Sequence, residues 1–151
     1  MSPGNAEIAR TVWAGLEIEP GLELESMSRE ELDRRLRIDL IDEDVEIRNV
    51  EGSATASGYR GHDGMRKWAI EVWEVFSEVR HEVLEVVEGP DGESVVSVQR
   101  TRGRMRHSGL EVEYRWAGVW RFRDGKVRSA HGYRSRTTAF EQAGIPHGGG
   151  G

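Results

Sequence analysis

Apolar residues near the start of the chain recur every fourth position, which is the spacing of one face of an amphipathic helix. Ile8, Val12 and Leu16 form this stripe, and we therefore predict a helix over residues 5–17. Pro20-Gly21 then interrupts the chain, because neither residue favours a continuing helix.

The second stripe consists of Leu32, Leu36 and Leu40, again four residues apart. It follows Ser28-Arg29-Glu30-Glu31, which has the sequence of a capping box. In that motif the serine hydroxyl accepts from the third helical N–H, and the glutamate reaches back to the cap. We predict a second helix at about 28–40.

The third stripe is the widest, so we expect the third helix, at about 63–79, to be the most buried of the three. Its apolar residues are Met65, Trp68, Ala69, Val72, Trp73, Val75, Phe76 and Val79. Before this helix, Val45 and Ile47 alternate with charged residues as in a short strand, and the small residues of 51–61 predict a loop.

After residue 80 the apolar positions alternate, as they do in strands. Turn sequences separate four predicted strands, at about 80–88, 94–106, 110–122 and 126–136. A short helical turn over 137–143 follows. Because helices precede the sheet rather than alternating with its strands, the predicted class is α+β, with three N-terminal helices packed on an antiparallel sheet.

A two-residue turn at Ser108-Gly109 would fix the register of the central hairpin. It pairs Arg106 with Glu111 and Arg104 with Glu113, so that opposite charges face each other. On the other face large residues meet small ones: Gly103 with Tyr114, Thr101 with Trp116, Gln99 with Gly118, and Ser97 with Trp120. These pairings predict one aromatic face, covered by the third helix, and one charged face.

The last hairpin has two possible registers around Asp124-Gly125. The favoured one, a three-residue loop with a glycine bulge, places three residues on the aromatic face: Ala130, Gly132 and Arg134. A two-residue Asp-Gly turn would instead place two others there: His131 and Tyr133. A buried arginine on that face would need a carboxylate or an anionic ligand as its partner.

The chain has 151 residues, 36% of them hydrophobic and 32% charged, which fits one folded domain over 1–145 and a glycine-rich tail over 146–151. The absence of cysteine excludes disulfides, thiolate metal sites and a cysteine nucleophile. The net charge of −6 argues against nucleic-acid binding, and no apolar run approaches the ~20 residues of a membrane span. No signal sequence is visible, so we expect a cytoplasmic protein.

Five stretches of the sequence, in this order and spacing, resemble the nuclear transport factor 2-like superfamily, in particular its SnoaL-like and ketosteroid isomerase-like branch. They are Asp44-Val45-Glu46-Ile47, YRGHDGMRKW (59–68), RTRGRMRHSGLEVE (100–113), VWRFRDGKVRSAHGYRSR (119–136) and TAFEQAGI (138–145). The resemblance covers about residues 5–145. It implies a bent sheet wrapped round a helix, which makes a cone with an internal pocket. It also implies a homodimer, which we expect to form through the sheet.

The catalytic positions of the ketosteroid isomerase-like pattern carry other residues here. Asn49 stands where the resemblance implies a carboxylate base, and Gly118 stands where it implies a second acid. Residues 11–13, where a tyrosine donor is implied, contain no tyrosine. An amide cannot abstract a carbon-bound proton, and glycine has no side chain to donate to an oxyanion. Steroid-isomerase chemistry is therefore not expected.

Three other polar groups have structural interpretations. The acidic cluster at 39–44 could supply a base but fits a solvated turn better. Asp63 is interpreted as the cap of the third helix, and His62 as exposed. The five histidines have no metal-ligand spacing, so we expect no metal and no cofactor.

The candidate ligand-pocket residues belong to the aromatic face and its rim: Asn49, Trp68, Gln99, Thr101, Tyr114, Trp116, Trp120, Arg134 and His131. An aromatic-lined space with few polar groups suits a small hydrophobic or aromatic ligand. We expect a ligand-binding SnoaL-like domain. The alternatives are an acid–base enzyme without metal, such as a polyketide cyclase, isomerase or dehydratase, and a dimeric interaction module whose cone is filled by side chains.

Overall fold

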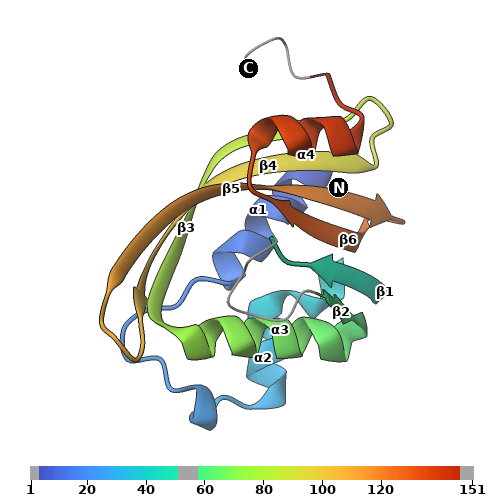
Figure 1. The fold of residues 1–151 in the computed structure, drawn as a ribbon. Coiled ribbons are helices and arrows are strands. Elements are labelled where there is room, and N and C mark those ends of the chain that lie inside the picture. The colour runs from blue at the N-terminus through green and yellow to red at the C-terminus, as the bar shows by residue number, and fades with distance from the viewer. Residues whose placement is uncertain (1–3, 51–57, 147–151) are drawn as a thin grey trace.

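The computed structural model describes residues 4–50 and 58–146 (Figure 1). The helices are α1 (Asn5–Gly15), α2 (Arg29–Leu36), α3 (Gly61–Val75) and α4 (Arg136–Ala143), with short 3-10 turns η1 (Leu24–Ser26) and η2 (Ile38–Leu40). The strands are β1 (Ile41–Arg48), β2 (Gly58–Arg60), β3 (Phe76–Glu88), β4 (Ser94–Met105), β5 (Glu111–Arg123) and β6 (Lys126–Tyr133). Most of the loop expected over 51–61, and all but the first residue of the expected tail, lie outside the described residues.

The six strands form one bent sheet in the order β2-β1-β6-β5-β4-β3. Its long strands β3, β4 and β5 curve around α1, while α3 crosses one end of the sheet and α4 lies at the other end (Figure 1). Neighbouring strands pair antiparallel except β1 and β6, which run parallel. The predicted α+β class, with helices packed on a curved sheet, is confirmed.

The first two helices form where the stripes predicted them. Ile8, Val12 and Leu16 are all buried, and the Ser28 hydroxyl accepts from the backbone N–H of Glu31 at 3.1 Å. The second helix ends at Leu36 rather than residue 40. Its end is fixed by Arg37, which adopts the left-handed conformation (φ 54°), so that a 3-10 turn leads directly into β1.

The third helix, α3, ends at Val75 although its apolar stripe continues to residue 79. Arg106 explains this end, because its guanidinium donates to the carbonyls of Trp73 and Phe76, each at 2.8 Å, and its backbone N–H donates to Val75. These donors satisfy carbonyls that a terminating helix leaves without partners. From Phe76 onward the chain instead pairs with β4.

The register predicted for the central hairpin is wrong by two residues. Arg104 pairs with Glu111, not Glu113, because residues 106–110 form a longer loop in which Gly109 has a positive φ of 73°. A shift of two keeps every side chain on its predicted face. Opposite charges therefore still meet, with Arg104 and Glu111 at 2.7 Å, and Trp116 now faces Gln99 instead of Thr101.

The turn of the last hairpin is the two-residue one that the sequence analysis did not favour. Asp124 and Gly125 both have positive φ (52° and 75°), as a type I′ turn requires. A β-bulge lies between the Phe122–Val127 pair and the Arg121–Ser129 pair. It returns the side chains of β6 to the faces that the favoured register predicted for them. Ala130 therefore faces Trp120, and Gly132 faces Gly118.

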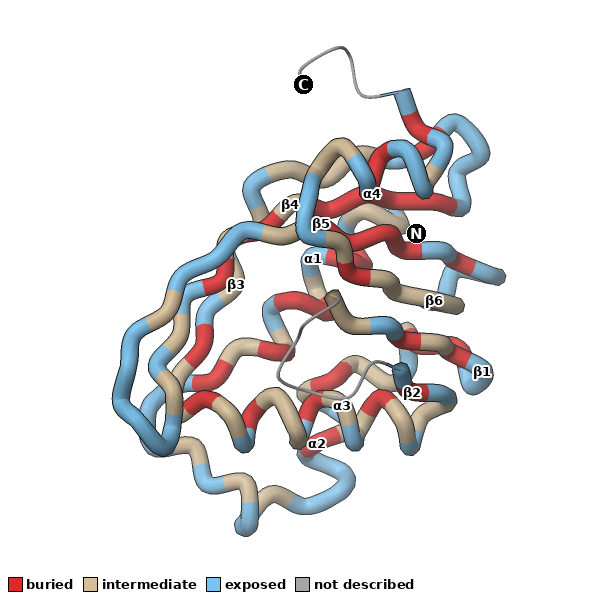
Figure 2. The backbone as a smooth tube through the Cα atoms, viewed as in Figure 1, coloured by how far each residue is buried: buried red, intermediate tan, exposed pale blue. Residues whose placement is uncertain are grey.

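Two hydrophobic clusters stabilise the sheet from opposite faces (Figure 2). The larger one fills the concave side between the sheet, α1 and α3, and includes Trp13, Trp73 and Trp120. The smaller one joins Phe140 of α4 to Val96 and Val119 on the outer face. The outer face is thus charged near the β4–β5 turn but apolar beneath α4.

Candidate functional site

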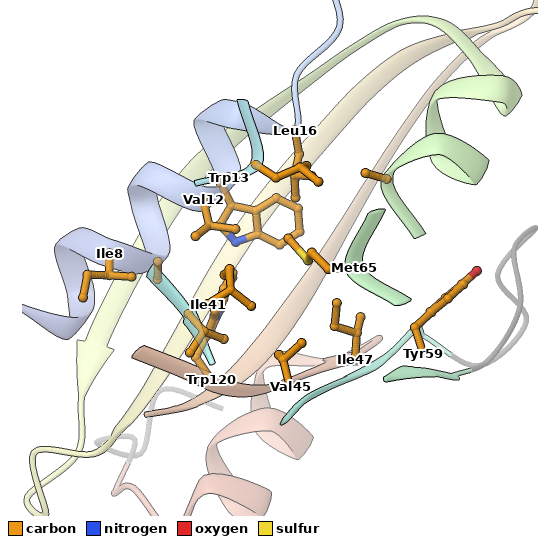
Figure 3. Close-up of a cluster of buried hydrophobic side chains, with 14 of the residues drawn as sticks. Ile8, Val12, Trp13, Leu16, Ile41, Val45, Ile47, Tyr59, Met65 and Trp120 are labelled. Carbon is orange, nitrogen blue, oxygen red and sulfur yellow. The ribbon is translucent and has the colours of Figure 1, made fainter. Parts of the chain in front are cut away.

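The concave cluster leaves a small cavity between α1, α3, β1, β5 and β6. Its volume is about 30 Å³, and four tryptophans line it together with aliphatic side chains and Met65. The tryptophans are Trp13, Trp68, Trp116 and Trp120. Figure 3 shows side chains from α1, β1, α3 and β5 converging on this region around Trp13.

Trp13 is the central side chain of the interior. Its ring lies edge-on to Trp116 at 4.8 Å and to Trp120 at 5.9 Å between centroids, and 4.7 Å from the ring of His81. Edge-to-face contacts of this kind are favoured by the ring quadrupoles. Trp13 belongs to the buried side of α1, together with Ile8, Ala9 and Val12, and this side of the helix faces the interior.

Asn49 lies just beyond β1 and lines the cavity. The indole Nε1–H of Trp68 donates to its Oδ1 at 2.7 Å. An indole N–H can only donate, so this bond fixes the amide with its oxygen toward Trp68. At the position where the resemblance implies a base, the side chain is therefore an uncharged amide whose orientation is fixed by the hydrogen bond from Trp68.

The three positions that the resemblance links to catalysis meet at this cavity. Asn49 and Gly118 line it, as do Val12 and Trp13 from the range 11–13, and no aspartate or glutamate does so among the described residues. A Cβ at position 118 would lie 3.3 Å from both Ser97 Oγ and Trp120 Nε1, so the glycine leaves room for the bond between those two atoms. The cavity wall offers no carboxylate to act as a base.

The structure places the candidate pocket residues in three groups. Asn49, Trp68, Trp116, Trp120 and His131 line the cavity. The other four residues lie outside this lining. Gln99 and Thr101 are fully buried, and Tyr114 and Arg134 are exposed on the surface. Arg134 follows the last residue of β6, so it does not extend the inner face as expected.

Gln99 and Trp13 carry buried polar atoms without a partner among the described residues. Both amide atoms of Gln99 and the indole Nε1 of Trp13 make no hydrogen bond there. Thr101 differs, because its hydroxyl accepts from Trp116 Nε1 at 2.9 Å and contacts His81 Nδ1 at 3.0 Å. Burying an amide without hydrogen-bond partners lowers the stability of the fold. Gln99 is therefore a polar side chain in a mainly apolar interior whose hydrogen-bonding groups are available to a ligand.

His81 is an interior residue that the sequence analysis missed. Burial lowers the pKa of its imidazole to about 4, so the ring is neutral near pH 7. It shares the inner face with Val79 and Val83, and this alternation in the sequence was a sufficient signal to place it there.

The other polar groups considered from sequence have structural partners. Asp42 accepts from the Asp44 backbone N–H and from Arg123, and these bonds hold the pKa of its carboxyl below the usual range. His62 is half-buried, not exposed, with its Nε2 2.8 Å from the Ile41 carbonyl. Asp63 pairs with Arg66 at 2.7 Å and does not cap α3, which has no side-chain cap.

No group of three histidine, aspartate or glutamate side chains within residues 4–50 and 58–146 is arranged to hold a metal ion. None of the helices in those ranges is long and apolar enough to cross a membrane.

Comparison with known proteins places this geometry in a family. A family model described as a SnoaL-like domain matches residues 24–130. No curated protein matches the sequence.

Solved structures with the same fold cover nearly the whole chain. A hypothetical protein with a ketosteroid isomerase-like fold from Catenulispora acidiphila, in complex with trimethylamine, has a TM-score of 0.65 and 15% identity over 97% of this chain and 96% of its own. A candidate SnoaL-like polyketide cyclase from Jannaschia has a TM-score of 0.65 and 14% identity over 95% and 93%. TerC, co-crystallised with polyporic acid, has a TM-score of 0.61 and 18% identity over 89% and 95%.

Proposed function

The chain belongs to the SnoaL-like domain family, and from this premise we propose that it binds a small apolar or aromatic molecule inside the cone. The observation that carries the proposal is the cavity wall, in which four tryptophans and aliphatic side chains outnumber the polar residues Arg48, Asn49 and His131, and which has no carboxylate among the described residues. Such a wall favours flat, apolar ligands and offers no carboxylate to abstract a proton from carbon.

The polar atoms near the cavity support binding rather than acid–base catalysis. Asn49 is held by Trp68, and the neutral amide cannot act as a base. His131 reaches the cavity lining, but its ring stacks on Tyr133 at a centroid distance of 4.5 Å. The Gln99 amide lies on the same sheet face as Trp116 and offers an NH2 donor group and a carbonyl acceptor to a ligand that reaches it.

The ligand must be small or must displace side chains. A cavity of about 30 Å³ holds one water molecule, whereas sites for drug-sized ligands typically enclose ~300 Å³ or more. Trp68 and Trp116 are half-buried, whereas the other two tryptophans of the wall, Trp13 and Trp120, are each 4% exposed, so a ligand would displace the first two more readily. Two of the structural neighbours were solved with small molecules, one with trimethylamine and one with polyporic acid. We therefore expect a contracted empty site that widens around its ligand.

Titration with 2-naphthol, a flat apolar probe, tests this proposal through intrinsic tryptophan fluorescence. We expect a saturable change in emission. Ala130→Leu fills space at the cavity wall and should weaken binding about tenfold or more. Ala143→Leu, a matched change in α4 on the outer side of the sheet, should leave binding unchanged. A change that never saturates, or one that both variants reduce equally, contradicts the proposal.

The acid–base alternative is tested by the conversion of a β,γ-unsaturated ketone to its conjugated isomer. We expect no turnover above background by the parent. Asn49→Asp restores a carboxylate but should gain at most weak activity, because Gly118 supplies no side-chain donor to the developing oxyanion. An absorbance time course follows the product. Robust turnover by the parent would revive the enzyme interpretation.

The small cavity volume also favours a second candidate, a dimeric interaction module whose cone is filled by its own side chains. Trp13 already occupies the centre of the cone. We propose that a homodimer would form through the outer face of the sheet. Light scattering coupled to size-exclusion chromatography measures the mass in solution. A dimer that shows no saturable probe binding favours this second candidate over ligand binding.

A further inference from the structure

A second hollow lies on the other side of β1 and β6 from the cone, between these strands, β5 and α4. Its volume is about 180 Å³, and its wall is polar where the wall of the cone is apolar. We call it the outer groove and define it by these lining residues: Arg48, Arg121, Ser129, His131, Tyr133 and Gln142. It is not the site described above, although Arg48, Ala130 and His131 border both spaces.

Two guanidinium groups give the outer groove a positive character within an acidic chain of net charge −6. Neither Arg48 nor Arg121 has a carboxylate partner in the part of the chain that the structure describes. Arg121 is held in place by Ser94 Oγ at 3.2 Å and by the Gln142 carbonyl at 3.0 Å. Elsewhere on the same face, arginines such as Arg100 and Arg104 are paired with glutamates.

The one acidic residue of the groove is already neutralised. Glu46 lines it, but its carboxylate pairs with Arg60 at 2.6 Å. Arg48 and Arg121 therefore leave the groove with a formal positive charge that no other acidic lining residue among those described offsets. An anionic ligand would supply negative charge there.

The floor of the groove adds hydrogen-bonding groups at regular spacing. Ser129, His131 and Tyr133 alternate along β6 and so share one face of the strand. The rings of His131 and Tyr133 stack with an interplanar angle of 22°. Burial and the nearby Arg48 lower the pKa of His131, and burial raises the pKa of Tyr133, so both side chains are uncharged near pH 7. Tyr133 therefore retains the hydroxyl proton that it would donate.

We propose that the outer groove binds a small molecule through an oxyanion, a carboxylate or phosphate group held between Arg48 and Arg121. Guanidinium groups suit such anions because their fixed N–H donors match two oxygen acceptors. The Tyr133 hydroxyl and the Ser129 hydroxyl supply further donors. The volume of about 180 Å³ accommodates a free phosphate or a single-ring carboxylate. An oxyanion at this site requires no ligand in the cone, although Arg48, Ala130 and His131 border both spaces.

The test is a titration with inorganic phosphate and, separately, with benzoate, at pH 7 and constant ionic strength set by chloride. Two-dimensional NMR of the ¹⁵N-labelled full chain reads the result. We expect saturable shifts centred on Arg48, His131 and Tyr133. The pKa of His131 should rise on binding, because a neighbouring anion favours the imidazolium. Saturation by phosphate alone or by benzoate alone assigns the anion class within the proposal.

Three variants separate the groove from general charge effects. Arg48→Gln should weaken binding about tenfold or more, since hydrogen bonds to charged groups are the strong ones. Tyr133→Phe keeps the ring and should weaken binding by a smaller factor. Arg115→Gln is the control: Arg115 is exposed on the outer face of β5, also without a carboxylate partner among the described residues, but outside the groove. Shifts that do not saturate, or equal losses in Arg48→Gln and Arg115→Gln, overturn the proposal, as does an unchanged His131 pKa.

Discussion

On the inner face of β5 and β6, Trp116 and Trp120 stand beside Gly118 and Gly132, whereas the outer face of the same strands carries Arg121, His131 and Tyr133. The inner cavity is apolar and measures about 30 Å³, and the outer groove is polar and measures about 180 Å³. Because successive side chains of a strand point to opposite faces of the sheet, the same two strands can line the inner cavity and the outer groove. The titratable groups near the cone thus face mainly away from its interior.

This separation is the reason for proposing ligand binding, rather than acid–base catalysis, in the cone. The position of the implied base is an amide that Trp68 fixes, and the position of the implied second acid is Gly118. Function on a shared fold is decided by the residues of the site. The predictions below probe the inner face, His81 on that face, and the charged outer face.

The largest effect is expected for Trp13→Ala, which removes the central side chain of the inner face. Trp13 is 4% exposed, and truncation of a buried tryptophan costs about 3–5 kcal/mol. Chemical denaturation monitored by circular dichroism gives the free energy of unfolding. Leu110→Ala is the control, because Leu110 is 65% exposed and its truncation should change stability by less than about 0.5 kcal/mol. Equal effects of the two changes would show that the inner face is not the core.

A smaller effect is expected from the titration of His81. Its pKa is about 4 in the folded protein and ~6.5 when unfolded, so only the unfolded chain takes up a proton between these values. Stability should therefore fall as the pH drops from 7 toward 4, by at most about 3 kcal/mol from this group.

His81→Gln should remove that part of the pH dependence. The free energy of unfolding is measured at several pH values for the parent and the variant, and their difference isolates His81. His107→Gln, which changes an exposed histidine in the β4–β5 loop, is the matched control variant for the loss of one histidine. A parent and a His81→Gln variant with parallel pH profiles would contradict the burial of this ring.

The smallest effect is expected on the charged part of the outer face. Arg104 and Glu111 pair at 2.7 Å with both side chains largely exposed, and such pairs are worth about 0–1 kcal/mol. The double change to alanine should therefore be close to neutral in thermal unfolding. A loss above roughly 2 kcal/mol, or a fall in mass by light scattering, would indicate that this face is a subunit interface.

The sequence predicted the faces of the sheet better than its turns. The aromatic and charged sides of β4 and β5 are correct, because a shift of two residues preserves alternation. The loop length is wrong, because the guanidinium and backbone of Arg106, assigned to a charge pair, instead bind the end of α3. Periodicity is a local signal, whereas this contact joins residues thirty positions apart.

The candidate site was predicted only in part for a similar reason. Trp68, Trp116 and Trp120 were placed by periodicity, and Asn49 by the resemblance. The outer groove was not anticipated, because it depends on α4 packing against β5 and on β1 pairing in parallel with β6. Neither contact leaves a repeating pattern in the sequence.

The most direct measurement of the central claim is a crystal of the protein soaked with iodobenzene, whose iodine is located by its anomalous signal. We predict a peak inside the cone, next to Trp13, Trp68 and Trp116, with these rings moved outward around the ligand. No peak within the cone, or peaks confined to the surface, would contradict an apolar ligand site there.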